Sequence, residues 1–381
     1  MKPVLIAGAG LSGAVLAREL AEAGLCVEVH EAREHIGGNC HTERDAQTGV
    51  MIHHYGPHIF HTADREVQDY VTRFARFREY RHRVWTTRGG HVYPMPVTLA
   101  TINQFFGKAM DPAEARAFVA SQAEPIGTPA NFEEQALSMI GRDLYEAFFK
   151  GYTEKQWGMS PCALPASILK RLPLRFSYED SYFNHPFQAM PEEGYTPMIA
   201  AMLDHPGITV RLSTPLRAQQ AQQGAHLFWS GPLDAFFDHR LGRLGYRTLD
   251  FHHERGMGDR QGCAVMNYAD PDIPYTRITE HKHFAPWETH EETVVTREYS
   301  RLAGAQDIPY YPIRLVEEKT MLGRYLAEAQ KLTGVTFMGR LGTYRYLDMD
   351  ICIREALDLA GAYLAAQGKG ASLPAFMASP E

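Results

Sequence analysis

Residues 4–13 read VLIAGAGLSG, and this stretch decides the fold of the N-terminal part of the chain. The apolar run 4–7 is typical of a buried parallel strand, and the glycines after it form a G-x-G-x-x-G motif. Residues 12–23 carry apolar side chains at helical spacing, and Gly24 ends that helix as a C′ glycine. Residues 26–30 form a second β-like run that Glu31 closes. This order predicts a βαβ unit that binds a dinucleotide.

Each glycine of the motif has a separate physical task. Gly8 permits the tight turn after the strand, Gly10 lets the backbone approach a pyrophosphate, and Gly13 lets the helix pack closely on the strand. The phosphates then face the free N–H groups at the helix N-terminus. Glu31 follows Gly13 by 18 residues, where a carboxylate accepts both hydroxyls of a ribose. Because strand, turn, helix and acid agree, we interpret the unit as a cofactor site and not as a glycine turn without a ligand.

The residues after Glu31 favour FAD over NAD. Arg33 follows the acid, and a second glycine pair occurs in Gly37-Gly38-Asn39. Such a segment continues along an extended cofactor, whereas the chain of an NAD dehydrogenase more often enters another helix directly. We therefore expect this unit to hold FAD.

The composition excludes several classes of protein. The chain has 381 residues and a net charge of −7, so general binding to nucleic acid or to a membrane surface, which needs a basic face, is not expected. The five cysteines form no C-x-x-C pair, which predicts neither a disulfide framework nor a zinc site. A strand from residue 4 leaves no room for a signal peptide, and no apolar run approaches membrane-spanning length. These features predict a cytoplasmic protein.

The rest of the chain predicts a discontinuous α/β organisation. Beyond the βαβ unit we expect a helix at 64–80, a hairpin at 84–93, mostly helices at 98–158, a strand at 207–213, short strands within 225–310, a helix at 315–331, a strand at 335–339, a helix at 349–366 and a loose tail from Gly368. The predicted fold is a Rossmann-like FAD-binding domain with an inserted helical subdomain and an antiparallel or mixed β-sheet domain. The expected division is 1–80, 195–225 and 315–381 for the FAD-binding domain, 81–165 for the helical subdomain, and 166–194 with 226–314 for the β-sheet substrate domain.

Four clusters of side chains leave alternatives open. The histidines within 53–61 match no metal-site spacing, so we prefer a loop whose histidines hydrogen-bond locally or face a cofactor, and expect no metal. The arginines of 73–83 are interpreted as a solvated face and not as a nucleic-acid patch. The aromatic segment 148–158 is either a core helix or a platform on which a nucleobase stacks. An arginine within 170–182 can bind a phosphate bidentately.

Residues 339–350 are dense in tyrosine and arginine and precede the last predicted helix. Asp348 and Asp350 occupy positions where helix N-caps belong. If this helix points at the pyrimidine end of a flavin, its dipole would stabilise negative charge near N1 of the reduced ring.

Five separated motifs resemble those of prokaryotic UDP-galactopyranose mutases, in the same order and over nearly the whole chain. They are GPHIFHT (56–62), YTEKQW (152–157), FNHPFQAMP (183–191), YTRITEHKHF (275–284) and GRLGTYRYLDMD (339–350). The resemblance implies an isomerase that interconverts UDP-galactopyranose and UDP-galactofuranose for glycoconjugate or cell-wall biosynthesis. It also implies that the FAD must be reduced and that its N5 acts as nucleophile on the anomeric carbon.

The resemblance also implies roles for individual residues. Arg171, on a mobile loop, and Arg277 would clamp the diphosphate, and these two with His58 are the expected catalytic residues. The expected cofactor-binding residues are Gly8, Gly10, Ser12, Gly13, Glu31, Ala32, Gly38, Asn39, His58, Ile59, Val210, Arg340, Asp348 and Met349. The expected substrate-binding residues are His82, Phe148, Phe149, Tyr152, Thr153, Trp157, Arg171, Tyr182, Asn267, Arg277, Tyr311 and Tyr346. His82 departs from the asparagine of several relatives, which leaves its contact with the uracil open.

Two other functions remain alternatives. The first is an FAD-dependent oxidoreductase of the amine-oxidase or desaturase type, which would consume reductant or oxygen in proportion to product. The second is a binding protein with a vacated cofactor site, which would be colourless. For the mutase we expect NAD(P)H or another reductant to prime the flavin, and a homo-oligomer, a dimer or larger.

Overall fold

A computed structural model describes residues 2–171, 174–313 and 315–380. A parallel sheet with the strand order β10-β2-β1-β11-β17 combines strands from the N-terminal, middle and C-terminal parts of the chain. The strands are β1 (Val4–Ala7), β2 (Val27–His30), β10 (Ile208–Arg211), β11 (His226–Trp229) and β17 (Val335–Phe337). Every pair in this sheet is parallel, so the carboxyl ends of the strands meet at one edge.

Helices cover both faces of the parallel sheet because alternate side chains of each strand point to opposite sides. In β1, Val4 and Ile6 join one core, and Leu5 and Ala7 join the other. The first core includes residues of α1 (Leu11–Glu22), α2 (Arg65–Val71), α7 (Tyr195–Leu203) and α11 (Met349–Lys369). The second includes residues of α8 (Leu233–Phe236) and α9 (Val316–Ala329). This two-layered burial is typical of a doubly wound α/β domain, as the sequence predicts.

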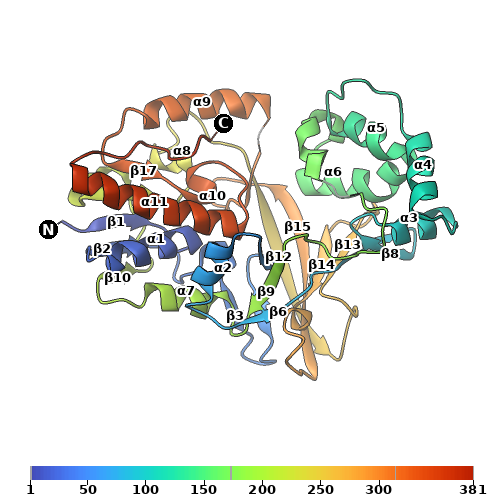
Figure 1. The fold of residues 1–381 in the computed structure, drawn as a ribbon, viewed down its shortest axis with the longest axis horizontal. Coiled ribbons are helices and arrows are strands. Elements are labelled where there is room, and N and C mark those ends of the chain that lie inside the picture. The colour runs from blue at the N-terminus through green and yellow to red at the C-terminus, as the bar shows by residue number, and fades with distance from the viewer. Residues whose placement is uncertain (1, 172–173, 314, 381) are drawn as a thin grey trace.

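A mixed seven-stranded sheet forms the middle of the molecule, with the order β16-β12-β15-β14-β13-β7-β8 (Figure 1). Its strands are β7 (Val84–Arg88), β8 (His91–Met95), β12 (Tyr246–Met257), β13 (Val265–Tyr268), β14 (Arg277–Glu280), β15 (Glu292–Leu302) and β16 (Tyr311–Pro312). Among the described strand pairs of this seven-stranded sheet, only β13–β7 is parallel. β7 and β8 form the predicted hairpin, although the predicted division placed them in the helical part. The division itself stays a prediction.

A group of helices lies at the opposite end of the molecule from the parallel sheet (Figure 1). It contains α3 (Leu99–Phe106), α4 (Pro112–Gln122), α5 (Phe132–Leu144), a π-helix η2 (Tyr145–Lys150), α6 (Gly151–Trp157), η3 (Pro161–Ala163) and η4 (Ala166–Arg171). These helices share a third hydrophobic core. Asp111 is the N-cap of α4, where its carboxylate accepts from Ala113 N and Glu114 N, both at 2.8 Å.

Short strands complete the fold. β3 (Thr42–Arg44) pairs with β4 (Met51–His53) after the turn η1 (Gly38–Cys40), and β9 (Phe187–Pro191) lies between β5 (Phe60–Thr62) and β6 (Phe77–Glu79). The remaining short helices are η5 (Ala218–Gln223), η6 (His281–Phe284) and α10 (Gly339–Gly342).

Two expectations about local structure are wrong. The helix predicted at 64–80 ends at Val71, because the residues after it are drawn into a strand that pairs with β9. The tail is not loose from Gly368: Phe337 N donates to Ala375 O at 2.8 Å, and Phe376 stacks on Phe337 with ring centroids 5.1 Å apart. In both cases a tertiary contact overrides the local pattern. Within the described residues, no helix is at once long and apolar enough to cross a membrane.

Candidate functional site

A cavity of about 400 Å³ opens at the carboxyl edge of the parallel sheet. The ends of β1, β2 and β11 contribute to its wall, as do the N-terminus of α1 and the segment that leads into α11. An edge where strands end and a helix begins is where doubly wound folds bind dinucleotides, because the helix offers free N–H groups there.

Glycines in the cavity wall let neighbouring backbone segments approach more closely than a Cβ would allow. A Cβ on Gly13 would lie 2.0 Å from the carbonyl oxygen of Gly8, so only glycine lets α1 pack on the turn this closely. Gly8 has a φ of +106°, and a Cβ there would meet Ser230 Oγ at 2.2 Å. A Cβ on Gly38 would lie 3.2 Å from Gly10 Cα, which means that the two glycine segments of the sequence face each other. The tight turn predicted at Gly8 and the close packing predicted at Gly13 match this geometry, and the approach of Gly10 to a pyrophosphate stays a prediction.

Glu31 lines the cavity and is held by the backbone. Its carboxylate accepts from Ala9 N at 2.8 Å and from Arg33 N at 2.9 Å. Arg33 donates to Asn39 Oδ1 at 2.8 Å, and its guanidinium lies 4.5 Å from the centre of the Tyr55 ring. The Glu31 carboxylate is therefore fixed at the end of β2, and the Arg33 guanidinium lies beside it. A carboxylate at this position can accept from an adenosine ribose, and a cation can bind a phosphate.

His58 and Arg340 lie in the wall of the same cavity, together with Met349 at the start of α11. Burial, reinforced by Arg340, lowers the pKa of His58 to about 4, so its imidazole is neutral at pH 7. Its Nδ1 lies 2.8 Å from the carbonyl oxygen of Gly56, which assigns the proton to Nδ1 and leaves Nε2 as an acceptor. Arg340 donates to Leu347 O at 2.6 Å.

Asp348 occupies the N-cap position of α11, but its side chain makes no capping hydrogen bond. The position was therefore predicted correctly and the capping role was not. Asp350 is buried and accepts from Ile351 N at 2.8 Å. Burial lowers the pKa of His61, and the charge of Asp348 opposes this shift. The same charge adds to the raised pKa of Tyr182, a predicted substrate-binding residue.

A second polar cluster surrounds Arg277 on β14. Its guanidinium donates to Tyr152 Oη at 2.6 Å, and its Nε lies 3.5 Å from Glu298 Oε1 on the paired strand β15. Burial alone would lower the pKa of Arg277, but the Glu298 carboxylate raises it overall, so the side chain remains a cation. Burial, opposed by Arg277, raises the pKa of Tyr182 to about 12, which keeps its hydroxyl protonated.

Besides Arg277 Nε itself, two polar atoms beside it are buried without a hydrogen-bond partner among the described residues. They are His82 Nδ1 and Asn267 Oδ1. Asn267 lies directly opposite Arg277 in the β13–β14 register, and the charge of Arg277 acts on His82, whose pKa burial lowers to about 3. An unsatisfied buried polar atom costs about 1–3 kcal/mol, and a polar ligand that bonds to it would recover this free energy.

Arg340 joins the cavity to the Arg277 cluster. Its guanidinium lies 4.8 Å from the centre of the Tyr346 ring, and Tyr346 stacks on Tyr311 with centroids 5.9 Å apart. Burial and the Glu298 carboxylate raise the pKa of the Tyr311 hydroxyl, and the Arg277 cation opposes them. These contacts therefore extend from the cavity wall to Tyr311, which lies within electrostatic range of Arg277.

Several predicted site residues lie apart from the cavity wall. Phe148 and Phe149 are buried in the helical core, where Phe148 packs edge-on against Tyr93 and Phe105, which favours the core interpretation of that segment. Thr153 is also buried and Trp157 borders the same core. Ile59 and Val210 pack in the core beside the parallel sheet and do not line the described cavity. The side chain of Arg171 lies outside the described residues. The substrate and cofactor roles of all these residues stay predictions.

Sequence reasoning missed Ser230, which lines the cavity and donates to Ala7 O at 2.6 Å. Its position directly after a predicted strand is a signal that could have identified it, because parallel strands end at the same edge. Glu298 was also missed, and no local pattern distinguishes it.

Comparison with known proteins relates the chain to one family over its whole length. A family model described as UDP-galactopyranose mutase matches residues 147–346, and one described as an NAD(P)-binding Rossmann-like domain matches residues 6–74. The chain is 54% identical to "Probable UDP-galactopyranose mutase" of Klebsiella pneumoniae, with 98% of each chain covered. It is 48% identical to a dTDP-fucopyranose mutase of Escherichia coli, with 96% of this chain and 99% of the relative covered.

A solved structure of a reduced UDP-galactopyranose mutase has a similar fold, with a TM-score of 0.74 over 96% of this chain and 94% of that chain. The identity is 16%, so this likeness concerns the fold alone. The matched segments include both the glycine cradle and the strand that carries Arg277.

Proposed function

The chain belongs to the UDP-galactopyranose mutase family of flavin-dependent isomerases, and we propose that it interconverts UDP-galactopyranose and UDP-galactofuranose with reduced FAD as its cofactor. The observation that supports this proposal is the Arg340–Tyr346–Tyr311 contact chain, which extends from the cofactor cavity to a tyrosine whose pKa the Arg277 charge acts to lower. A reaction between a cofactor and a nucleotide sugar needs such adjacency.

The cavity supports FAD as the cofactor. Gly13 and Gly8 let the N-terminus of α1 and the turn after β1 approach closely, and Glu31 lines the cavity, where it would accept from an adenosine ribose. At the other end of the cavity, α11 begins at Met349, so its N-terminal dipole would favour negative charge on a reduced flavin ring that lies against it. When bound and reduced, the flavin supplies through N5 a nucleophile for the anomeric carbon. Priming by NAD(P)H or another reductant and assembly into a homo-oligomer are further parts of the proposal.

Arg277 binds the diphosphate in this account. The bond between the sugar and the diphosphate breaks and forms again, so negative charge rises on the phosphate and then falls. A permanent cation aimed at that phosphate stabilises the charge and holds the nucleotide for its return. The hydroxyls of Tyr152, Tyr182, Tyr311 and Tyr346 donate to the same group, and Arg171 is the second arginine of the proposed clamp. No side-chain nucleophile is required in this proposal.

Asn267 and His82 bind polar groups of the nucleotide sugar in this proposal, because each carries a buried polar atom that lacks a hydrogen-bond partner among the described residues. His58 stays neutral and offers Nε2 as an acceptor beside the flavin and sugar.

The nearest alternative keeps the chemistry and changes the nucleotide sugar. The dTDP-fucopyranose mutase of Escherichia coli is 48% identical to this chain over nearly its full length, so dTDP-fucose is a second candidate substrate. Dithionite-reduced protein incubated in parallel with UDP-galactofuranose and dTDP-fucofuranose distinguishes the two. We expect the higher kcat/KM for UDP-galactofuranose. A higher kcat/KM for dTDP-fucofuranose would replace the proposed substrate.

The diphosphate role of Arg277 has its own test. Arg277→Met should weaken UDP binding about 30- to 1000-fold, since a charge-assisted bidentate contact contributes about 2–4 kcal/mol. Uridine binding should stay nearly unchanged, and the flavin should be retained. Arg297→Met is the matched control, because Arg297 lies on the neighbouring strand and pairs with Glu254 at 2.9 Å. Equal losses for UDP and uridine would contradict a diphosphate clamp.

A further inference from the structure

Three side chains with metal-binding atoms gather on one face of the β3–β4 hairpin. In this antiparallel pair Thr42 lies opposite His53, and His54 N donates to His41 O at 3.3 Å. His41 and His54 are therefore cross-strand neighbours. Glu43 lies two residues along from His41, so its side chain points to the same face.

The geometry of this face fits a metal ion. One ligand atom from each of His41, Glu43 and His54 lies within 4.8 Å of the other two. His54 Nε2 and Glu43 Oε2 are 3.3 Å apart, and a tetrahedral ion with bonds of about 2.1 Å separates its ligand atoms by about 3.4 Å. His54 Nε2 is buried, and no described residue forms a hydrogen bond with it. The two histidines are half-buried while Glu43 is exposed, so an ion can reach the site from solvent.

The ring of His41 is fixed by contacts at its Nδ1 atom and by stacking on one of its faces. Its Nδ1 lies 3.1 Å from both Ile36 O and Thr196 Oγ1, and the ring stacks on His35 with centroids 3.8 Å apart. Metal-binding histidines are commonly fixed in this way, because an acceptor at one ring nitrogen orients the other toward the metal. We propose that His41, Glu43 and His54 form a site for a divalent transition-metal ion such as Zn²⁺.

Two imidazoles and one carboxylate are a ligand set that Zn²⁺, Co²⁺ and Ni²⁺ accept. A fourth position remains for water. The sequence predicted no metal because only the spacing of the histidines within 53–61 was considered. Two of the three proposed ligands, His41 and Glu43, precede that segment. His41 directly follows η1, whose residues Gly38–Cys40 line the cofactor cavity. The bound ion would therefore stabilise the β3–β4 hairpin next to the cofactor cavity.

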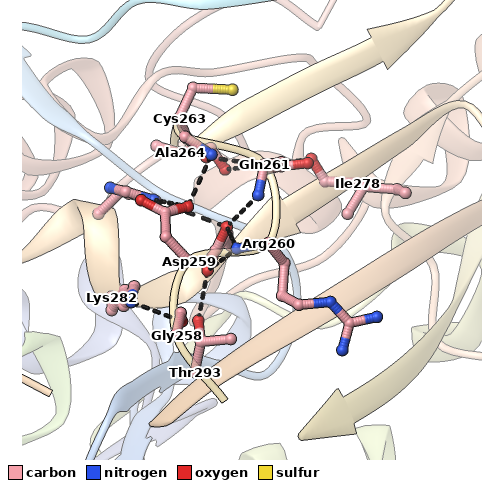
Figure 2. Close-up of polar contacts among 12 residues, drawn as sticks. Gly258, Asp259, Arg260, Gln261, Cys263, Ala264, Ile278, Lys282 and Thr293 are labelled. Atoms are coloured by element: carbon pink, nitrogen blue, oxygen red, sulfur yellow. Dashed lines mark hydrogen bonds and ion pairs between the residues drawn. The ribbon is translucent and has the colours of Figure 1, made fainter. Parts of the chain in front are cut away.

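A second cluster of similar composition, Asp259, Glu280 and His283, behaves differently. His283 Nε2 lies 3.2 Å from Asp259 Oδ1 and 3.6 Å from Glu280 Oε2. The Glu280 carboxylate also accepts from Gln261 N at 2.8 Å and from Thr293 Oγ1 at 2.6 Å. Figure 2 shows this turn, in which residues Gly258 to Ala264 close around such contacts. A metal would have to displace the proton of His283 and several hydrogen bonds, so this cluster is a control for the proposed site.

Metal titration of the purified flavoprotein tests the proposal. After treatment with EDTA and transfer to metal-free buffer, Co²⁺ is added and its visible absorption followed, and Zn²⁺ is then used as competitor. We expect one strong site per chain. His54→Gln should weaken Zn²⁺ binding at least 100-fold, and Thr196→Val, which removes one of the two partners of His41 Nδ1, about 10-fold. His283→Gln should bind as the unchanged protein does.

Flavin absorbance and the metal-free unfolding midpoint verify that each variant is folded. If His54→Gln weakens binding without lowering that midpoint, the ion is bound by the hairpin. The proposal is overturned if the unchanged protein binds no stoichiometric Co²⁺ or Zn²⁺, or if His54→Gln and Glu43→Gln bind with unchanged affinity. Binding that is lost in His283→Gln instead would also overturn it, because the ion would then occupy the other cluster.

Discussion

Replacing Gly13 with alanine should release the flavin even though alanine is the better helix former. A Cβ at position 13 would lie 2.0 Å from the carbonyl oxygen of Gly8, whereas ordinary contacts begin at 3.4 Å. The first turn of α1 would have to move away from the β1 turn by about 1.4 Å. The neighbouring atom belongs to the backbone, so no side-chain rotation relieves the overlap.

The expected magnitude follows from two opposing effects. Helix propensity favours alanine over glycine by about 1 kcal/mol. Overpacking costs about 1–3 kcal/mol, and a shift of this size breaks the N–H contacts of the helix to a phosphate, each contributing about 1.5–3 kcal/mol. The net loss in flavin binding is about 2–4 kcal/mol, which corresponds to a dissociation constant roughly 30 to 1000 times larger.

Gly361→Ala is the matched control, because Gly361 lies inside α11 and a Cβ there meets no atom within 4 Å. Flavin affinity is measured by fluorescence on refilling the flavin-free protein, and stability by urea unfolding. We expect Gly361→Ala to keep its flavin affinity and to gain up to about 1 kcal/mol in stability. If Gly13→Ala also keeps its affinity, the close approach of α1 to the turn does not form the cofactor cradle.

Three further predictions concern Glu298, the C-terminal segment and pH. Glu298→Gln should lower the free energy of unfolding by about 2–4 kcal/mol, because Arg277 loses its buried counter-charge; an unchanged urea midpoint would contradict the pairing. Phe376→Ala should cost about 1–3 kcal/mol in the same assay, since the ring stacks on Phe337, and a loose tail would give no effect. Burial lowers the pKa of His53 to about 3 and of His226 to about 4. The unfolded chain takes up these protons near pH 6.5 and the folded chain does not, so stability should fall as the pH is lowered from 6.5 toward 4. Each group should contribute about 2 kcal/mol of that loss by pH 5, and His226→Asn should reduce the slope in urea unfolding.

The sequence allowed the cofactor cradle to be predicted because its physics is local. Gly8, Gly10, Gly13 and Glu31 follow one another along a single strand–helix–strand path, and each residue type meets a steric or charge requirement of that path. The helix breaks before α4 and the hairpin β7–β8 are local in the same sense, since capping and turn residues mark them.

Features that depend on distant pairing were not predictable from the chain alone. Residues 77–79 read as part of a helix until β9, more than 100 residues later, supplies a strand partner. Glu298 becomes the counter-charge of Arg277 only through the β14–β15 register. The three proposed metal ligands likewise meet through the pairing of β3 with β4 and not through a spaced motif.

Turnover per reduced flavin distinguishes a mutase from an oxidoreductase. Dithionite-reduced protein is mixed with an excess of UDP-galactofuranose under nitrogen, the nucleotide sugars are separated by chromatography, and the flavin absorbance is followed throughout. The account predicts many molecules of UDP-galactopyranose per flavin while the absorbance stays that of the reduced form. Absence of UDP-galactopyranose with flavin bound and reduced would contradict it. So would reoxidation of one flavin for each product formed, which would point to an oxidoreductase.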